Sequence, residues 1–221
     1  MLAILMAAMV SAFAGEEDLQ AIVQKVERHY ESVKDFEADF TQRYERRLLR
    51  RTVEESGRVS VKKPGRMRWE YRTPEEKLFV TDGTKTYFYL PKEKQVMVSH
   101  TPEGAMGMEA GSPFELLTGK RGLSESFTVS ASDSPATQGG LVLRLLPRER
   151  HDEFEEVELE VRREDGRVLR VVLVDGQKNR TEFLFRDAEE NVGLPESLFR
   201  FTIPSGVEVV VQQSANPNGA P

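Results

Sequence analysis

Near the start of the chain, apolar residues recur every three or four positions. They are Leu19, Ile22, Val23, Val26, Tyr30 and Val33. This spacing places them on one face of a helix, and the segment begins with acidic residues and continues with basic ones, as the helix dipole favours. The pattern predicts one amphipathic helix over residues 17–34.

From Phe36 onward the apolar period shortens to two residues, which is typical of a strand with one buried face. Phe36, Ala38, Phe40, Gln42 and Tyr44 share one face in this way. Similar runs continue almost to the end of the chain. The pattern predicts strands at 36–48, 52–62, 66–72, 77–81, 85–90, 94–99, 126–131, 140–147, 154–163, 167–174, 179–186, 199–203 and 207–211.

Turn-forming residues separate these runs. Three Asp-Gly pairs, Asp82-Gly83, Asp165-Gly166 and Asp175-Gly176, favour the positive φ angles of tight hairpin turns. Residues 63–65 and 91–94 supply two further turns. The sequence therefore predicts an all-β body made of antiparallel hairpins rather than βαβ units.

Two irregular segments interrupt the strands. Residues 101–112 lack periodicity, and Ser112-Pro113 then supplies an N-cap and a first-turn proline for a short helix from Phe114 to Thr118. Residues 132–140 form a polar connection, and residues 212–221 have the composition of a disordered tail. Since no repeat or interdomain linker is recognisable, residues 15–211 are expected to form one domain.

The first 14 residues, MLAILMAAMVSAFA, form an apolar run that ends in the cleavage pattern Ala12-Phe13-Ala14. The run is too short to span a bilayer as a helix. We expect a signal peptide over residues 1–14 and an exported chain that begins at Gly15. No Lys or Arg precedes the run, which suggests that the leader begins further upstream.

Composition narrows the classes of function. With 38% hydrophobic and 31% charged residues, the chain is typical of folded soluble proteins. The formal net charge of -6 argues against a nucleic-acid partner, which normally requires a clustered basic face. The absence of cysteine excludes disulfides, thiolate metal sites and cysteine nucleophiles. Catalytic, phosphate-binding and dinucleotide motifs are also missing, so neither an enzyme nor a cofactor is predicted.

Two basic runs contrast with the acidic average. They are RYERRLLRR at residues 43–51 and KKPGRMR at residues 62–68. Each run could recognise an anionic partner or an anionic membrane surface, or it could keep a solvated strand edge from pairing. The pattern leaves these interpretations open.

Large aromatic and apolar side chains gather in the first half of the chain. They are Phe36, Phe40, Met67, Trp69, Tyr71, Phe79, Tyr87, Phe88, Tyr89 and Phe114. Such a set can form an ordinary core or the wall of an apolar cavity, and composition does not separate the two. A sizeable cavity requires one curved sheet over helices, whereas two packed sheets would fill the space.

An ordered series of short motifs covers most of the chain after the leader. The motifs are FEADFTQ at 36–42, GRV at 57–59, KPGRMRWEY at 63–71, VTDG at 80–83, YFY at 87–89, SPFELL at 112–117 and FTIPSGVEV at 201–209. Together they resemble the outer-membrane lipoprotein carrier family, LolA. The resemblance implies a mainly β fold with a few helices, in which a strongly curved antiparallel sheet forms an unclosed half-barrel covered by a helical lid.

The resemblance also implies a function. Members of the family carry acylated lipoproteins through the periplasm, from the inner to the outer membrane, with the acyl chains in an apolar cavity. The implied partners are an inner-membrane ABC-type lipoprotein-releasing complex and, where present, an outer-membrane acceptor lipoprotein, and the carrier itself is expected to be a monomer. The residues expected to line the cavity are Phe36, Phe40, Met67, Trp69, Tyr71, Phe79, Tyr87, Tyr89, Phe114 and Leu117.

One basic position receives a specific role from the resemblance. In the family, the basic residue directly before the proline of the Trp-containing hairpin contacts the lid in the closed, empty form. Lys63 occupies that position here, where the best-known members have Arg. A lysine offers a point donor in place of a bidentate fork. The resemblance therefore implies that Lys63 is a lid latch.

Two alternative functions are weighed against the carrier. A periplasmic regulatory module of the same fold could sense lipids or lipoproteins, but such regulators carry a second C-terminal domain, for which the tail here is too short. A secreted lipid hydrolase would need a nucleophile beside His29, His100 or His151. The related outer-membrane receptor is lipid-anchored, and the missing cysteine favours the soluble carrier.

Overall fold

The computed structural model describes residues 18–99, 114, 117, 122–151 and 153–212. A helix over residues 18–32 is followed by strands, among which lie the short helices α3 (Leu123–Ser126) and η1 (Glu196–Phe199) and the helical residues Phe114 and Leu117. The strands are β1 (Asp35–Arg46), β2 (Arg51–Lys62), β3 (Arg66–Thr73), β4 (Lys77–Thr81), β5 (Thr86–Leu90), β6 (Gln95–Ser99), β7 (Phe127–Ala131), β8 (Leu141–Pro147), β9 (Glu156–Val161), β10 (Val168–Val174), β11 (Arg180–Glu190) and β12 (Glu208–Gln212).

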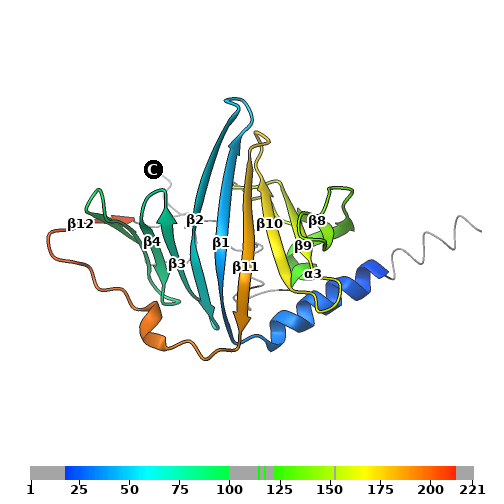
Figure 1. Cartoon of the computed structure of the whole chain (residues 1–221), viewed down its shortest axis with the longest axis horizontal. Coiled ribbons are helices and arrows are strands. Elements are labelled where there is room, and N and C mark those ends of the chain that lie inside the picture. Colours follow the sequence, from blue (N-terminus) through cyan, green and yellow to red (C-terminus); the bar gives the residue numbers. More distant parts are fainter. Residues whose placement is uncertain (1–17, 100–113, 115–116, 118–121, 152, 213–221) are drawn as a thin grey trace, which may run out of the picture.

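All of these strands belong to one sheet, in the order β12-β6-β5-β4-β3-β2-β1-β11-β10-β9-β8-β7 (Figure 1). Neighbours run antiparallel, except that β12 pairs with β6 in parallel. β1 therefore joins two meanders, one running from β1 to β6 and the other from β7 to β11. The antiparallel hairpins expected from the sequence are confirmed, and the boundaries of most strands differ by one or two residues.

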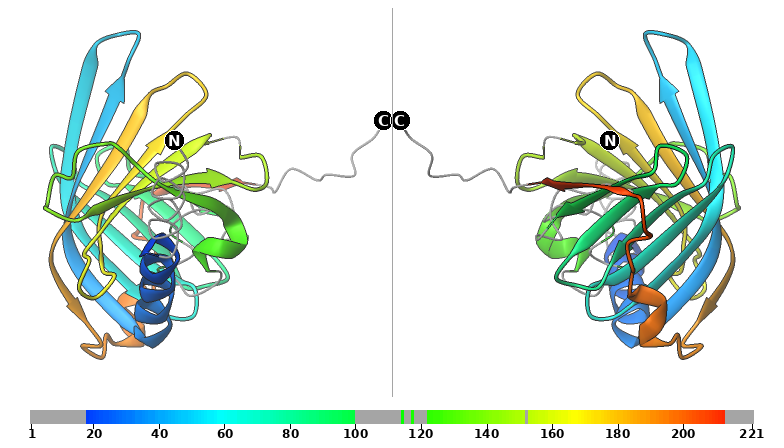
Figure 2. Two further views of the ribbon diagram at one scale, coloured as in Figure 1. Left: turned by 90° about the vertical axis from the view of Figure 1, so that its right-hand side faces the viewer. Right: turned by 90° about the vertical axis from the view of Figure 1, so that its left-hand side faces the viewer.

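The sheet is strongly curved and wraps around the N-terminal helix (Figure 2). The apolar stripe of the helix points into the sheet, and its members Ile22, Val23, Val26 and Tyr30 belong to the buried core. The turn between β9 and β10 contacts the helix directly, because a Cβ atom at Gly166 would lie 2.8 Å from the main-chain nitrogen of Val26. No helix in the described part of the chain is long and apolar enough to cross a membrane.

Alternation along each strand gives the sheet two different faces. Residues opposite one another on neighbouring strands face the same side, so rows of side chains run across the sheet. One row passes from Ala38 through Val59 and Trp69 to Phe79. All four are buried on the side of the sheet that packs against the helix, and we call this side the inner face.

The opposite, outer face carries polar residues, and one group of them is buried. The Glu160 carboxylate on β9 accepts hydrogen bonds from the main-chain N–H groups of Thr137, Gln138 and Gly140 at 2.7–3.2 Å and from Arg170 Nε at 3.0 Å. Arg170 also contacts Glu182 at 3.1 Å. This network holds the 132–140 connection against the sheet. Burial alone would raise the pKa of Glu160, but the donated hydrogen bonds outweigh it and lower the pKa.

The segment after β11 differs from the sequence-based expectation. The strand expected at 199–203 is wrong, because η1 and an irregular stretch occupy this region. Phe199 is buried, and the ring of Phe201 lies 5.4 Å and 5.5 Å from those of Tyr87 and Tyr89 on β5. Contacts with the outer face therefore take the place of pairing between strands.

Some expectations fall wholly or partly outside the described residues. The leader at 1–14 and residues 213–221 lie outside them, whereas Gln212 is the last residue of β12. Of the short helix expected at 114–118, the structure describes Phe114 and Leu117, both helical. The helix α3 was not predicted.

Candidate functional site

The inner face carries a group of aromatic rings drawn from distant parts of the sequence. Trp69 on β3 lies at its centre, with ring centroids 4.8 Å from Phe40 on β1 and 5.4 Å from Phe183 on β11. We call this group the inner-face aromatic cluster. Its members are Phe40, Trp69, Tyr71, Phe114, Phe183 and Phe185.

Phe114 and Leu117 reach the cluster from the segment that follows β6. The Phe114 ring lies 5.8 Å from Trp69 and 5.3 Å from Phe183, edge to face in both cases. Both side chains are buried. Residues from an inserted segment therefore close over the aromatic surface of the sheet.

Most of the residues proposed for a cavity wall lie together in one buried group. Its members from that set are Phe36, Phe40, Met67, Trp69, Tyr71, Phe79, Phe114 and Leu117. The rings contact one another in this structure, so these side chains are packed. Whether they part to admit a ligand stays a prediction.

Tyr87 and Tyr89 require a correction. The residue of β5 opposite Phe79 is Phe88, and Phe88 packs against the buried group. Because side chains alternate along a strand, Tyr87 and Tyr89 point to the outer face. There they contact Phe201, so they do not belong to the inner-face set.

Sequence reasoning missed Phe183 and Phe185 on β11. Phe185 lies opposite Phe40, and Phe183 lies opposite Gln42, which places both on the inner face. The two residues are two positions apart within the strand expected at 179–186, so the sequence pattern could have predicted that they share one face. What the sequence did not reveal was that β11 pairs with β1.

Few polar groups of the described residues accompany the cluster, and the chemistry that these residues offer follows from this. The hydroxyl of Tyr71 donates to Gln42 Oε1 at 2.7 Å, and Trp69 Nε1 donates to Met67 Sδ at 2.7 Å. Burial raises the pKa of Tyr71, so its hydroxyl stays protonated at neutral pH. Such a face offers dispersion and hydrophobic contact to an apolar ligand, and it offers little for acid or base chemistry.

Lys63 lies in the turn between β2 and β3, beside the C-terminal end of the helix. The ammonium group of Lys63 donates a hydrogen bond to the main-chain carbonyl of Tyr30. The main-chain N–H of Lys63 donates to the carbonyl of Lys34 at 2.9 Å. A cation is favourable at a helix C-terminus. Burial lowers the pKa of Lys63, and the charge of Glu31 opposes this effect. The side chain thus contacts the covering helix, and its role as a latch stays a prediction.

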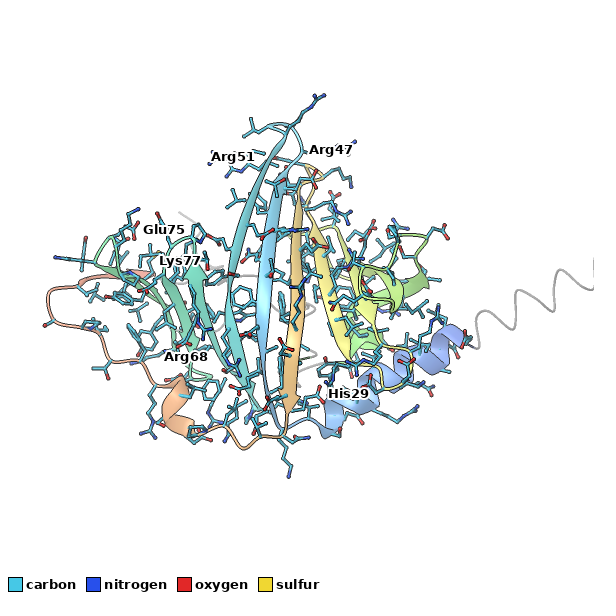
Figure 3. All side chains as sticks on the ribbon, in the orientation of Figure 1. His29, Arg47, Arg51, Arg68, Glu75 and Lys77 are labelled. Atoms are coloured by element: carbon cyan, nitrogen blue, oxygen red, sulfur yellow. The ribbon has the colours of Figure 1, made fainter. Side chains whose placement is uncertain are left out.

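Other polar contacts also tie the helix to the sheet. His29 Nε2 lies 3.0 Å from Glu190 Oε1 on β11, and Arg167 contacts the other oxygen of Glu190 at 2.8 Å (Figure 3 labels His29). The main-chain N–H of Val168 donates to the hydroxyl of Tyr30 at 3.0 Å. These contacts lie around the helix, whereas the surface beneath it is apolar.

The basic run at 62–68 serves contacts within the chain. Lys62 and Arg66 pair with Glu196 of η1 at 3.5 Å and 3.0 Å, and Arg68 donates to the carbonyl of Leu198 at 3.2 Å. These residues hold the segment after β11 against the sheet. The run therefore stabilises the packing of η1 against the sheet, a role that was not among the interpretations of the sequence.

The histidines considered for a hydrolase are separated. The ring of His29 pairs with the Glu190 carboxylate, and His100 lies outside the described residues. His151 stacks on Phe154 at a centroid distance of 4.5 Å. It lines a hollow of about 440 Å³ whose described lining residues include no Ser, Thr or Tyr. This geometry offers His151 no hydroxyl nucleophile among them.

Comparison with known proteins agrees with the fold. The sequence matches the family model described as outer membrane lipoprotein carrier protein LolA over residues 31–202. An outer-membrane lipoprotein carrier protein from Cupriavidus pinatubonensis is 31% identical over 197 residues, covering 88% of this chain and 89% of that protein. Its counterpart from Dechloromonas aromatica is 30% identical over 188 residues, covering 85% and 86%.

A solved structure, that of an uncharacterized conserved protein from Thermus thermophilus, has a similar fold. The TM-score is 0.54 at 18% sequence identity, and the alignment covers 87% of this chain and 98% of that one. The family model spans most of the chain, and both named relatives align over nearly their whole length. The chain therefore belongs to the outer membrane lipoprotein carrier protein family, LolA.

Proposed function

We propose that this chain is a periplasmic carrier that binds the acyl chains of lipoproteins against the inner face and ferries them from the inner to the outer membrane. The observation that carries the proposal is the inner-face aromatic cluster, which is apolar and shares one buried core with a helix that polar contacts hold to the sheet. An inner-membrane ABC-type complex would supply the cargo. An outer-membrane lipoprotein, where present, would accept it.

The energetics of acyl chains set what such a carrier must do. Exposing each CH₂ group to water costs about 0.8 kcal/mol, so a soluble carrier must offset most of this cost along each chain. It must also release the chains, which excludes permanent burial. In the empty carrier the aromatic rings contact one another. In the loaded carrier the helix moves and acyl chains contact the rings instead. The rings are shielded from water in both states, so such a cluster meets both needs.

The only tryptophan of the chain, Trp69, reports directly on this site. Binding of a synthetic triacylated lipopeptide with brominated acyl chains is expected to quench Trp69 fluorescence by at least half. Trp69 lies at the centre of the cluster, within contact of Phe40, Phe114 and Phe183. Steady-state fluorescence titration measures the effect.

A matched control places the reporter on the other face of the sheet. In a Trp69→Phe/Tyr89→Trp variant, the single tryptophan lies on β5 beside Phe201 and should keep most of its emission when the same lipopeptide binds. Equal quenching in both proteins, or none at Trp69, would contradict binding at the inner face.

Removing the ammonium group of Lys63 is expected to weaken helix closure. The contact to the carbonyl of Tyr30 is a charged hydrogen bond, whose loss shifts the open and closed populations roughly fivefold or more. Lys63→Leu should therefore retain or strengthen lipoprotein capture but transfer cargo to acceptor membranes more slowly. Lys63→Arg should behave like the unmodified protein. Capture and transfer assays with a purified lipoprotein measure both steps.

Lys85 provides the control for a general effect of losing a turn lysine. It is exposed in the turn between β4 and β5, where its described contacts are made by its main chain. Lys85→Leu should leave capture and transfer unchanged. If Lys63→Leu also changes neither step, Lys63 is an ordinary surface lysine.

A further inference from the structure

The hairpin that joins β1 and β2 projects beyond the rest of the sheet (Figure 1). Pairing of β2 with β3 ends at Ser56, opposite Thr73, and pairing of β1 with β11 ends at Glu45, opposite Arg180. Residues 46–51 extend past both neighbouring strands, and we call them the hairpin tip. Figure 3 labels Arg47 and Arg51 at this end, opposite the end that carries His29.

Two adjacent leucines occupy the hairpin tip. Leu48 is 84% exposed and Leu49 is 65% exposed, the two largest values among the exposed large apolar residues of the described chain. A single exposed leucine is ordinary on a protein surface. Two neighbours at the most projecting turn present apolar surface that the described part of the chain leaves uncovered.

Four arginines surround these leucines. Arg46 lies directly opposite Arg51 across the hairpin, an arrangement of like charges that destabilises a strand pair. Among the described residues, no carboxylate lies within ion-pair distance of Arg46, Arg47, Arg50 or Arg51. Nearby Glu54 pairs with Arg43, and Glu55 pairs with Lys77. The positive charge of the hairpin tip is therefore not neutralised by an ion pair with any residue that the structure describes.

The hairpin tip is connected to the inner face along one side of the hairpin. Tyr44 lies opposite Val53, and both are on the same side as Phe40, four residues before Tyr44. Val53 is partly exposed, and the guanidinium of Arg46 lies 5.4 Å from the centre of the Tyr44 ring. The side of the hairpin that carries Tyr44 and Val53 thus continues toward the inner-face aromatic cluster, with Gln42 and Glu55 between them.

We propose that the hairpin tip docks on the surface of an anionic phospholipid bilayer, with Leu48 and Leu49 in the acyl-headgroup boundary and the arginines on lipid phosphates. Guanidinium groups bind phosphate in a bidentate geometry, and basic residues beside an apolar wedge are typical of interfacial anchors. The inference goes beyond the cargo proposal and does not depend on it.

A bilayer fits this surface better than an acidic protein does. A stable protein interface normally buries more than about 1,000 Å², and a convex turn of six residues offers far less. A bilayer requires no matching pocket, because it admits a small apolar wedge and surrounds it with phosphates. The attraction should fall with salt, since exposed charges are screened beyond roughly 10 Å at 0.1 M ionic strength.

The test measures binding of the chain, expressed behind a functional secretory leader and purified from the periplasmic fraction, to vesicles in a flotation assay at 0.1 M salt. We expect binding to vesicles that contain phosphatidylglycerol and much weaker binding to vesicles of phosphatidylcholine alone. Arg47→Glu/Arg50→Glu should lower the affinity for anionic vesicles at least about 25-fold, and Leu48→Ser/Leu49→Ser at least about tenfold.

Matched variants separate docking from general charge or hydrophobicity. Arg163→Glu/Arg200→Glu makes the same change in net charge at exposed sites away from the hairpin tip. Val192→Ser/Ile203→Ser makes the same kind of apolar-to-polar change at two other exposed residues, which are 45% and 36% exposed. Both should bind like the unmodified protein. A Leu48→Trp variant should show blue-shifted emission with anionic vesicles, whereas Val192→Trp should not.

Three results overturn the proposal. They are equal binding to both kinds of vesicle, absence of binding to either kind, and equal losses in the hairpin-tip and control variants. If vesicles are not bound but soluble poly-glutamate is bound through the same arginines, the surface serves an acidic protein segment instead. Because no lipoprotein is present in these assays, their outcome is independent of the Trp69 quenching test.

Discussion

Replacing Gly57 with Ala is expected to lower the free energy of unfolding by at least about 3 kcal/mol. Gly57 on β2 lies between Phe40 on β1 and Tyr71 on β3. A Cβ atom there would lie 1.8 Å from the carbonyl oxygen of Glu70, which is a main-chain atom of the neighbouring strand. The two strands must therefore separate, because a main-chain atom within a ladder cannot turn aside.

The same glycine matters for the candidate site. Without a side chain at position 57, the rings of Phe40 and Tyr71 meet edge to face at a centroid distance of 5.0 Å. Separation of β2 and β3 would disturb this contact, so Gly57→Ala should also weaken lipopeptide binding by whatever protein remains folded. Urea unfolding followed by far-ultraviolet circular dichroism measures the stability change.

Gly176, in the turn between β10 and β11, supplies the comparison. A Cβ atom at this position would meet the end of the Glu155 side chain at 3.1 Å, and that carboxylate can rotate away. Gly176→Ala should cost less than about 1 kcal/mol. A Gly57→Ala protein as stable as Gly176→Ala would show that the approach of β2 to β3 is not the constraint.

Replacing Arg170 with Ala is expected to destabilise the protein by about 3–5 kcal/mol. The side chain of Arg170 is 6% exposed and that of Glu160 is 0% exposed, so truncation leaves a buried carboxylate without its counter-charge. Arg170 also donates to Glu182 and to the carbonyl of Pro135. Chemical denaturation at pH 7 measures the loss.

Two variants show whether burial causes this effect. Arg144 pairs with Glu156 at 2.8 Å on the same outer face, but both side chains are partly exposed, and Arg144→Ala should cost at most about 1 kcal/mol. A Glu160→Leu/Arg170→Met protein should recover only part of the loss, because the N–H groups of the 132–140 connection stay without an acceptor. Full recovery would show that the carboxylate is not needed there.

The same network predicts an acid dependence. Because the pKa of Glu160 is lowered in the folded protein, its ionised form adds stability above its unfolded pKa of about 4.3. That contribution should be lost as the pH falls from about 4.3 through the lower folded pKa. Glu160→Gln should be less stable at pH 7 and should lose less stability between pH 5 and pH 3. Equal acid slopes in both proteins would exclude this role for Glu160.

Local periodicity determined much of the fold and part of the site. The helix, most strands and the hairpins follow from spacings of 3.6 and two residues and from the Asp-Gly turns, all of which act between near neighbours in sequence. The alternation of Phe36 with Phe40 in β1, and of Met67, Trp69 and Tyr71 in β3, likewise identified side chains that share one face. Lys63 could be placed beside the covering helix only through the family resemblance.

Other features depend on which distant strands pair, and local pattern does not encode that. Alternation within Tyr87-Phe88-Tyr89 allows either Phe88 or the two tyrosines to face the core. Only the pairing of Phe88 with Phe79 places the tyrosines on the outer face. Pairing of β1 with β11 brought Phe183 and Phe185 to Trp69. Packing against β5 gave Phe201 a place outside any strand. Burial of Glu160 with Arg170 likewise required three strands and a connection to converge, because a buried charge is stable only where tertiary structure supplies its partners.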